Sequence, residues 1–366
     1  MTMGDKEGRG SPFLSNAWYM AAWSDELGDG LLSRRLLGCK TVLYRLENGG
    51  VAALADRCPH RFFPLSESTR KGDAIQCGYH GLVFDAAGAC IHNPFSEKLP
   101  AGVSIQTWPV EERDGIVWLW PGDPRKCDPT LIPDFSAIRC PTGKPPVKGY
   151  THSTAQYEYL TDNLMDLSHV EFVHRGTFGI DDLLFSGQHN LHREGDVVVT
   201  DWFIAGQVAP PWFRWRFGPE TRVDQWMNMR WEAPAVMQLQ IGVTAMGRPR
   251  EEGSVVRQAH IITPETAGSS HYFWSTTRFD PDASDEADAV LRERQIQAFE
   301  REDKPVIEAA YANLEGGDFW EQKPVFLGFD TGPAMVRRIL QKMIADEARQ
   351  GTSVPRNELE RLADGR

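Results

Sequence analysis

Two pairs of a cysteine and a histidine lie close together in the sequence, and all four side chains are metal ligands. Cys58 and His60 are separated by one residue in CPHRFFPLS, and Cys77 and His80 by two in CGYHGLVFD. Thiolate sulfur and imidazole nitrogen bind zinc or the irons of an iron–sulfur cluster. Because glycine and proline accompany both pairs, we expect two loops that close over one metal centre.

The spacing of the first pair favours a cluster over zinc. Structural zinc sites usually place two or more residues between paired ligands, whereas only Pro59 separates Cys58 from His60. In a mixed-ligand [2Fe–2S] cluster, Cys58 and Cys77 bind one iron, and His60 and His80 bind the other. Two imidazoles in place of two thiolates raise the reduction potential of such a cluster.

A second group of candidate ligands lies in the segment NLMDLSHVEFVH. His169 and His174 are five residues apart, a rotation of about 140° on an α-helix, so a regular helix does not direct both toward one ion. A π-bulge or a break between them does. Asn163 and Asp166 precede His169 at intervals of three and form a polar stripe on an otherwise apolar helix. Because buried polar groups need partners, the stripe raises the expectation of a metal site above that of two solvated histidines.

Two histidines and one carboxylate form the facial triad of non-haem Fe(II) oxygenases, which leaves coordination positions open for O2 and substrate. Spacing alone does not select the carboxylate among the 51 aspartates and glutamates of the chain. The residues by themselves therefore leave the third ligand open.

The elements that position these residues divide into two parts. From about residue 39 to 120, short β-type runs alternate with turns such as ENGG, which predicts a small all-β domain. The segment PGDPRKCDPTLIPDF then interrupts both helix and strand patterns. We expect one domain at residues 1–135 and a second at residues 136–366.

The second domain combines helical and strand patterns, so we expect an α+β fold of antiparallel sheet flanked by helices. A helix is predicted over residues 157–174, several long strands follow, and a second helix is predicted over about 284–314. The C-terminal segment reads as an amphipathic helix with a charged end. The 12 tryptophans and 18 phenylalanines are enough either for a large core or for an apolar ligand pocket as well.

Composition narrows the class of protein. A net charge of −12 and the lack of a dense Lys/Arg cluster disfavour nucleic acid and anionic membranes as partners. No apolar run reaches the length of a membrane span, and the polar N-terminal residues lack the apolar stretch of a signal peptide. Six cysteines without regular spacing do not form a disulfide framework. We therefore expect a cytoplasmic protein without a membrane partner.

Taken in order, the motifs resemble the α subunit of Rieske non-haem iron aromatic-ring oxygenases of the vanillate O-demethylase and dicamba O-demethylase type. The similarity extends over nearly all of residues 13–315 and includes NAWYMAAW, CPHRFFPLS, CGYHGLVFD, ERDGIVWLWPGDP, DNLMDLSHVEFVH and HIITPETAGSSHYFW. The resemblance implies a Rieske [2Fe–2S] domain followed by a catalytic domain of the helix-grip, START-like kind.

The resemblance also implies the third iron ligand. In this family the carboxylate precedes a K-x-V-x-E-A motif, which here is part of EREDKPVIEA, so Asp303 is the expected ligand and Glu302 its local rival. Asp166 resembles the aspartate that bridges a cluster histidine and an iron histidine across the subunit boundary of a homotrimer. Asn163 would lie near the iron and orient water or substrate.

One position, His260, resembles a substrate contact of the family, and three further residues are expected to line the same pocket. His260 matches a position that contacts the polar end of the substrate, and Leu239, with its neighbour Gln240, and Arg294 are expected to shape the same pocket. A core histidine and a solvated helix arginine remain the alternatives for His260 and Arg294. An inward-pointing Arg294 would favour a carboxylated aromatic substrate.

The activity that the resemblance implies is O-demethylation of a small methoxylated aromatic acid with release of formaldehyde. The mononuclear Fe(II) would use O2 as co-substrate. Electrons would come from a partner ferredoxin or flavin reductase, with NADH acting only through that partner, because no G-x-G-x-x-G motif follows a predicted strand. A ring-hydroxylating or N-demethylating oxygenase is the nearest alternative. A Rieske electron carrier without oxygenase activity is the alternative from another class.

Overall fold

The computed structural model divides the chain into two compact units, described separately below. It describes residues 12–99, 102–138, 144–175, 177–178, 186–278 and 284–350. The first unit contains the residues up to Ile132, Thr263–Ala267 and the residues from Gln341 onward, and the second contains Pro133–Ile262 and Gly268–Leu340. The sequence pattern did not predict that two later segments would belong to the first unit.

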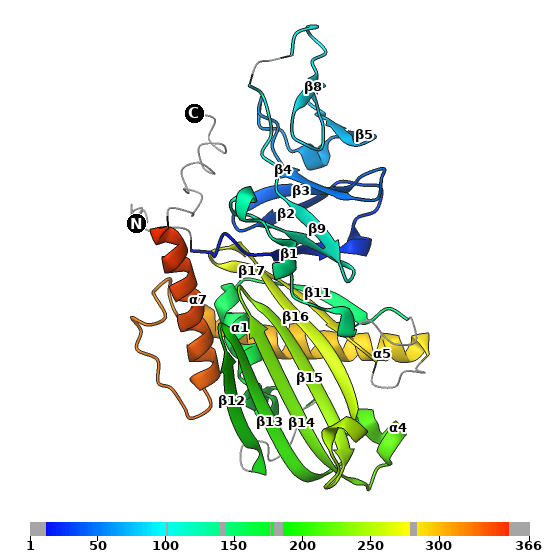
Figure 1. Cartoon of the computed structure of the whole chain (residues 1–366), viewed down its shortest axis with the longest axis vertical. Helices are drawn as coiled ribbons and strands as arrows, with labels where there is room; N and C mark the ends of the chain where they lie inside the picture. The colour runs from blue at the N-terminus through cyan, green and yellow to red at the C-terminus, as the bar shows by residue number, and fades with distance from the viewer. Residues whose placement is uncertain are drawn as a thin grey trace. The chain divides into compact units, whose positions relative to one another are not determined.

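The first unit consists of three small antiparallel sheets (Figure 1). The strand orders are β1-β10-β9, β2-β3-β4 and β5-β6-β7-β8. The strands are β1 Tyr19–Trp23, β2 Leu32–Leu36, β3 Cys39–Arg45, β4 Val51–Ala55, β5 Thr69–Lys71, β6 Ala74–Gln76, β7 Val83–Phe84, β8 Cys90–His92, β9 Val110–Arg113 and β10 Ile116–Leu119. The expected small all-β domain is therefore found.

The loops that carry the cysteine–histidine pairs emerge from these sheets. Cys77 directly follows β6, and Cys58 lies three residues after β4. Both cysteines are buried in one hydrophobic cluster. Other buried members of this cluster are Val42, Tyr44, Leu54, Leu65, Ile75, Leu82 and Phe84. The apolar strand residues thus anchor the base of both loops.

The second unit contains a seven-stranded antiparallel sheet in the order β11-β17-β16-β15-β14-β13-β12, except for the end of β16 from Thr263 onward, which belongs to the first unit. Its strands are β11 Val147–Ser153, β12 Gln188–Glu194, β13 Val197–Val208, β14 Arg222–Glu232, β15 Val236–Ala245, β16 Ser254–Thr266 and β17 Ser269–Thr276. Directly paired residues share a face, so the register places Leu239 beside Met229 and Gln258. The neighbouring register places Met237 beside His260 on the same face.

Helices accompany this sheet, as the α+β prediction requires (Figure 1). They are α1 Tyr157–Met165, α2 Val170–Val173, α4 Arg214–Phe217, α5 Asp285–Ile296, α6 Lys304–Ala312 and α7 Thr331–Arg349. A π-helical segment, Gln297–Asp303, joins α5 to α6. Phe299 of this segment packs against Trp274 and Tyr272 of β17, with ring centroids 5.5 and 5.6 Å apart. The π-helical segment is thereby fixed to the sheet.

The two predicted helices are interrupted where the candidate ligands lie. The helix predicted over residues 157–174 ends at Met165, continues as a 3₁₀ turn at Leu167–His169, and resumes in α2. The second predicted helix forms, but a π-helical segment occupies its centre. The sequence raised the possibility of a π-bulge or a break between His169 and His174. The π-helical segment of the structure lies instead between α5 and α6, at Gln297–Asp303.

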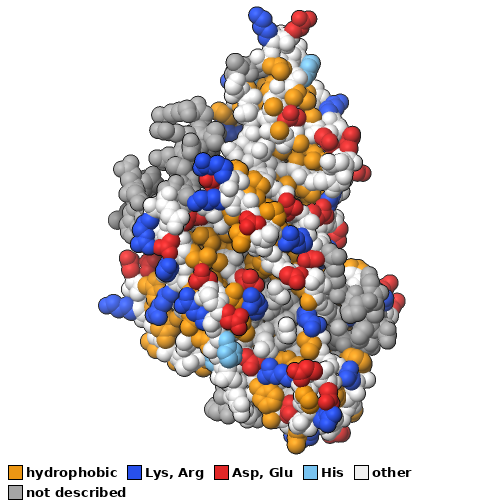
Figure 2. All heavy atoms as spheres, viewed as in Figure 1, with side chains coloured by type: hydrophobic (Ala, Val, Ile, Leu, Met, Phe, Trp, Pro, Cys, Tyr) orange, Lys and Arg blue, Asp and Glu red, His pale blue; other side chains and the backbone are white. Residues whose placement is uncertain are grey.

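Among the described residues, no helix combines the length and the apolar character needed to cross a bilayer. Figure 2 shows acidic and basic side chains interspersed over the visible face of the molecule.

Candidate metal centres

The two cysteine–histidine loops have the same backbone hydrogen bonds. In the first loop, the N–H of Cys58 donates to the carbonyl of Phe63 (2.9 Å) and the N–H of Phe62 donates to the carbonyl of Cys58 (2.9 Å). In the second, the N–H of Cys77 donates to the carbonyl of Leu82 (2.8 Å) and that of Gly81 donates to the carbonyl of Cys77 (3.0 Å). Each loop is therefore a six-residue unit closed by its own backbone.

The fifth residue of each unit has a left-handed backbone. Gly81 has φ +75° and Phe62 has φ +62°. Glycine adopts this conformation without a steric penalty, whereas phenylalanine does not. The Arg57 guanidinium lies 3.8 Å from the centroid of the Phe62 ring, a cation–π contact that favours the phenylalanine here.

The four candidate cluster ligands lie together at these loops. The rings of His60 and His80 are 4.4 Å apart between centroids. Cys58 and Cys77 are buried, with exposed fractions of 1% and 2%, and neither forms a disulfide. Burial and the neighbouring Cys77 thiol raise the pKa of Cys58 to about 11, so a positively charged iron is needed to hold it as a thiolate. Two thiols at the base and two imidazoles above them fit a [2Fe–2S] cluster.

Three side chains of the second unit form a second candidate metal site. Among the described residues, the ligand atoms of His169, His174 and Asp303 all lie within 4.8 Å of one another. His169 ends the 3₁₀ turn, His174 follows α2, and Asp303 ends the π-helical segment. The helix interruptions therefore occur at the residues that converge.

The distances fit a shared metal ion. Oδ1 of Asp303 lies 3.5 Å from Nε2 of His169 and 3.3 Å from Nε2 of His174. An ion about 2.1 Å from each donor separates neighbouring donors by about 3 Å at right angles, so a small movement admits it. Asp303 and His174 are buried, with exposed fractions of 4% and 5%. Burial disfavours a charged imidazole, but Asp303 and Glu302 outweigh it and raise the pKa of His174.

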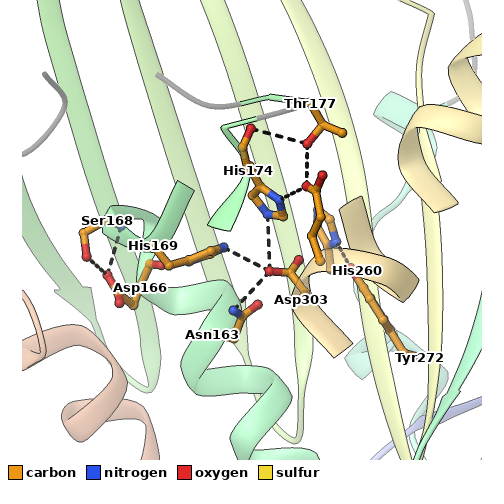
Figure 3. Close-up of polar contacts among 10 residues, drawn as sticks. Asn163, Asp166, Ser168, His169, His174, Thr177, His260, Tyr272 and Asp303 are labelled. Atoms are coloured by element: carbon orange, nitrogen blue, oxygen red, sulfur yellow. Dashed lines mark hydrogen bonds and ion pairs between the residues drawn. The ribbon is translucent and has the colours of Figure 1, made fainter. Parts of the chain in front are cut away.

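Figure 3 shows His169 and His174 directed toward Asp303, and each histidine is held through its other ring nitrogen by a separate acceptor. Nδ1 of His169 contacts the main-chain carbonyl of Asp166, and Nδ1 of His174 lies 2.8 Å from Oε2 of Glu302. A hydrogen-bond acceptor at Nδ1 keeps the proton there and leaves the lone pair on Nε2 for a metal. Both Nε2 atoms accordingly face Asp303.

The predicted polar stripe is only partly present. Nδ2 of Asn163 donates to Oδ1 of Asp303 over 3.3 Å, so Asn163 does lie at the site. Asp166, however, is at the end of α1, where its Oδ1 accepts a hydrogen bond from the N–H of Ser168 (2.9 Å). Among the described residues its carboxylate accepts from Ser168 rather than from His169, and its expected bridging role across a subunit boundary stays a prediction. The Asp166 carbonyl contacts His169 because the helix breaks at this residue.

His260 is a fully paired core residue next to the site. Its Nδ1 lies 2.6 Å from the hydroxyl of Tyr272 and its Nε2 lies 3.1 Å from Oε1 of Gln258. Burial lowers the pKa of His260 to about 3, so the imidazole is neutral. Leu239, on the same face of the sheet, is buried and apolar.

Two other predicted pocket residues face solvent. Arg294 is exposed on α5, so its interpretation as a solvated helix charge is correct and the inward-pointing prediction is wrong. Its neighbour Gln295 is the buried residue at this point of the helix. Gln240 is also exposed, because it follows Leu239 on β15 and therefore points to the opposite face.

Sequence reasoning did not identify Thr177 and Tyr272. The Thr177 hydroxyl donates to Oε2 of Glu302 over 2.6 Å, and Tyr272 pairs with His260. Neither residue type has a spacing signal that marks such a role. Glu302 was considered only as a rival of Asp303, and its proximity in sequence was the available signal.

A buried pair of thiols facing two imidazoles, together with a separate two-histidine, one-carboxylate site, defines the class of Rieske non-haem iron oxygenases. Two family models match the chain: the Rieske [2Fe–2S] domain over residues 17–109, and the vanillate O-demethylase oxygenase C-terminal domain over residues 153–346.

Individual relatives match over almost the whole chain. The oxygenase component of chloroacetanilide N-alkylformylase from Rhizorhabdus wittichii is 37% identical and covers 92% of this chain and 97% of its own. The oxygenase component of dicamba O-demethylase from Stenotrophomonas maltophilia is 38% identical over 92% and 99%. A structure of dicamba monooxygenase with non-heme iron and dicamba is 36% identical, superimposes with a TM-score of 0.79, and covers 92% of this chain and 99% of its own.

The chain belongs to the vanillate O-demethylase oxygenase family of Rieske non-haem iron oxygenases. It is the oxygenase component of such a system, and its cofactors are a Rieske [2Fe–2S] cluster and a mononuclear iron.

Proposed function

We propose that the two loops of the first unit hold the [2Fe–2S] cluster through Cys58, His60, Cys77 and His80. The matching hydrogen bonds of the loops and the 4.4 Å separation of the two imidazole rings support this assignment. Thiolates bind one iron and neutral imidazoles the other.

We propose that His169, His174 and Asp303 bind the mononuclear iron. The supporting observation is that one oxygen of Asp303 lies within 3.5 Å of both Nε2 atoms. When bound, the ferrous ion supplies the centre at which O2 is activated with electrons from the cluster. The buried carboxylate holds the site, and the Asn163 amide, 3.3 Å from Asp303, orients water or substrate beside it.

The proposed reaction is oxidative O-demethylation of a small methoxylated aromatic acid. One oxygen atom of O2 enters a C–H bond of the methoxy group, and the hemiacetal that forms breaks down to a phenol and formaldehyde. The other oxygen atom takes up two electrons and two protons and leaves as water. A ferredoxin or flavin reductase supplies the electrons and oxidises NADH. The dicamba O-demethylase relative supports this choice.

N-dealkylation of a neutral anilide is a second candidate, because the described residues at the expected substrate contacts provide no inward charged anchor. His260 is neutral with both ring nitrogens paired, Leu239 is apolar, and Arg294 is exposed. A chloroacetanilide N-alkylformylase component is among the relatives. The two candidates differ in the charge of the substrate and in the atom that carries the alkyl group.

Turnover of matched substrates tests the proposal. The purified chain is combined with a reductase and NADH and offered a methoxybenzoate, its methyl ester and an N-alkoxyalkyl chloroacetanilide. Formaldehyde and a phenol from the benzoate support O-demethylation of an acid, and dealkylation of only the anilide supports the second candidate. Formation of a cis-diol identifies a ring-hydroxylating enzyme. A purified chain that holds two irons rather than three, with no turnover, identifies an electron carrier.

We further propose a cytoplasmic homotrimer in which Asp166 connects the cluster of one subunit to the iron of the next. One carboxylate oxygen of Asp166 accepts from Ser168, and Asp166 is half-buried, so its second oxygen is available to a neighbouring subunit. Sedimentation equilibrium tests the assembly: a mass three times that of the chain supports it, and a monomer contradicts it.

A further inference from the structure

The imidazole of His174 lies between two consecutive carboxylates. Its Nε2 is 3.3 Å from Oδ1 of Asp303, and its Nδ1 is 2.8 Å from Oε2 of Glu302. The side chains of all three residues are largely buried, with exposed fractions of 6% for His174, 5% for Asp303 and 14% for Glu302. Two adjacent residues of the π-helical segment thus reach opposite edges of one ring.

Glu302 is itself fixed by two further donors. The Thr177 hydroxyl donates to Oε2 over 2.6 Å, and Nε2 of Gln297 donates to Oε1 over 3.4 Å. Thr177 is also connected to His174, because its N–H donates to the His174 carbonyl over 2.9 Å. A carboxylate oxygen that already accepts from Thr177 is an acceptor toward His174 as well. The ring proton of His174 therefore stays on Nδ1.

We propose that Glu302, held by Thr177, is a positioning residue that presents His174 to the mononuclear iron and strengthens the binding of that ion. This inference rests on the proposed assignment of His169, His174 and Asp303 as iron ligands. An anionic partner fixes the ring orientation and makes Nε2 a stronger donor. It also supplies the second negative charge that, with Asp303, balances the two positive charges of Fe(II) in a buried site.

His169 provides an internal comparison. Its Nδ1 contacts a main-chain carbonyl, which carries no net charge. The two histidines therefore differ in their outer partners, and only His174 depends on a side chain that mutation can remove. We expect changes at Glu302 to act through one of the two imidazoles.

The test measures Fe(II) affinity by competition with a chelator, in the full chain with its Rieske cluster loaded. Glu302→Gln removes the charge and keeps the shape, and we expect Fe(II) binding to weaken about 10- to 100-fold, the range for outer partners of a metal ligand. Glu300→Gln is the matched control, because Glu300 lies in the same π-helical segment but accepts from Thr151 over 3.1 Å. Its affinity should stay within about twofold of wild type, below that range.

Thr177→Val gives a second, milder variant, which removes only the donor that holds Glu302. We expect a loss of Fe(II) affinity between those of Glu300→Gln and Glu302→Gln. The Rieske absorption spectrum, unchanged in all variants, reports that the chain is folded.

Co(II) substituted for iron distinguishes an outer partner from a ligand. The visible spectrum of bound Co(II) should be the same in Glu302→Gln and wild type, because the ligand atoms are unchanged. Wild-type Fe(II) affinity in Glu302→Gln overturns the inference, and so does an altered Co(II) spectrum, which would make Glu302 a ligand. If Asp303→Asn retains wild-type affinity, the proposed triad itself is wrong and this inference falls with it.

Discussion

The two metal centres are built in opposite ways. The candidate cluster ligands all lie between residues 58 and 80, in two loops that close on themselves through main-chain hydrogen bonds. The candidate iron ligands extend from residue 169 to residue 303, and His174 and Asp303 are contacted by side chains of other elements. The first centre therefore depends on local backbone geometry, and the second depends on how distant helices pack.

This difference predicts which substitutions each metal centre should tolerate. A loop closed by its own backbone keeps its shape when surrounding side chains change, because its hydrogen bonds do not involve them. A site assembled from two interrupted helices needs outer partners such as Glu302 and the Asp166 carbonyl to direct its histidines. Variants that affect one centre without the other are the most direct way to examine the contrast.

The largest effect is expected from removing one ligand of each centre. Asp303→Asn should lower the iron content from three to two per chain and abolish turnover, while the Rieske spectrum remains, because Asp303 contacts both candidate iron histidines. Cys58→Ser should remove the two cluster irons and leave the mononuclear site able to bind Fe(II). Iron analysis and visible spectroscopy measure both outcomes.

The result would contradict the separation of the centres if either variant emptied both of them. Glu293→Gln is a suitable control, since Glu293 is exposed on α5 and pairs with Arg301 at the surface. We expect this control to hold three irons.

A smaller effect is expected from Asp166→Asn. The main-chain carbonyl that contacts His169 remains in this variant, so iron binding should be retained. The lost carboxylate charge should slow turnover about 10- to 100-fold, as for other partners of metal ligands. Stopped-flow oxidation of the reduced cluster locates the step that slows. Loss of the mononuclear iron would show instead that the carboxylate stabilises the site within the chain.

His260 should make the stability of the second unit depend on pH. Burial lowers its pKa to about 3 from the ordinary 6.5, so between these two pH values the unfolded chain binds this proton and the folded chain does not. The stability is present above pH 6.5 and is lost as the pH falls toward 3, by about 2 kcal/mol between about pH 6.5 and pH 5. His260→Gln should remove this part of the dependence. Urea unfolding of wild type and His260→Gln at about pH 6.5 and pH 5 measures the free energy of unfolding. An equal loss of stability in both proteins would contradict the role given to His260.

The smallest effects concern the fifth residue of each cluster loop. Gly81→Ala should destabilise the first unit by about 1–2 kcal/mol, because φ is +75° and the new Cβ lies 3.3 Å from Cγ of Pro94. Phe62→Gly relieves a similar strain but loses the cation–π contact with Arg57, so the net change should be under about 1 kcal/mol. Thermal unfolding monitored at the Rieske absorption band compares the two. Equal destabilisation by Gly81→Ala and Phe62→Gly would contradict the expected dependence on the left-handed backbone at these positions.

The same contrast decided what the sequence could predict. The candidate cluster ligands could be proposed from their spacing, because residues that are close in sequence and bounded by turns are close in space. The two candidate iron histidines formed a pattern in the sequence, but Asp303 required a family resemblance, since its distance along the chain carries no signal. Nothing in the residue types showed that Glu302 would face the opposite edge of His174.

The errors also have physical causes. Arg294 was a candidate pocket residue with a solvated helix charge as its alternative, and the face that α5 buries includes Gln295 and leaves Arg294 in solvent. The polar stripe assumed a continuous helix, and the break after Met165 turned the Asp166 carboxylate toward Ser168. Helix interruptions depend on packing between distant elements, and amphipathic periodicity does not report them.

The six-residue loops Cys58–Phe63 and Cys77–Leu82 have a consequence for protein design. Each is complete in itself: a cysteine at the first position, a left-handed residue at the fifth, and hydrogen bonds that return to the start. The histidine occupies the third position in one loop and the fourth in the other, so the scaffold does not prescribe where the imidazole stands. We therefore expect such a loop to keep its backbone shape on another scaffold that supplies an apolar base, so that two of them on adjacent hairpins of an unrelated β-protein would test the design of an artificial electron-transfer centre.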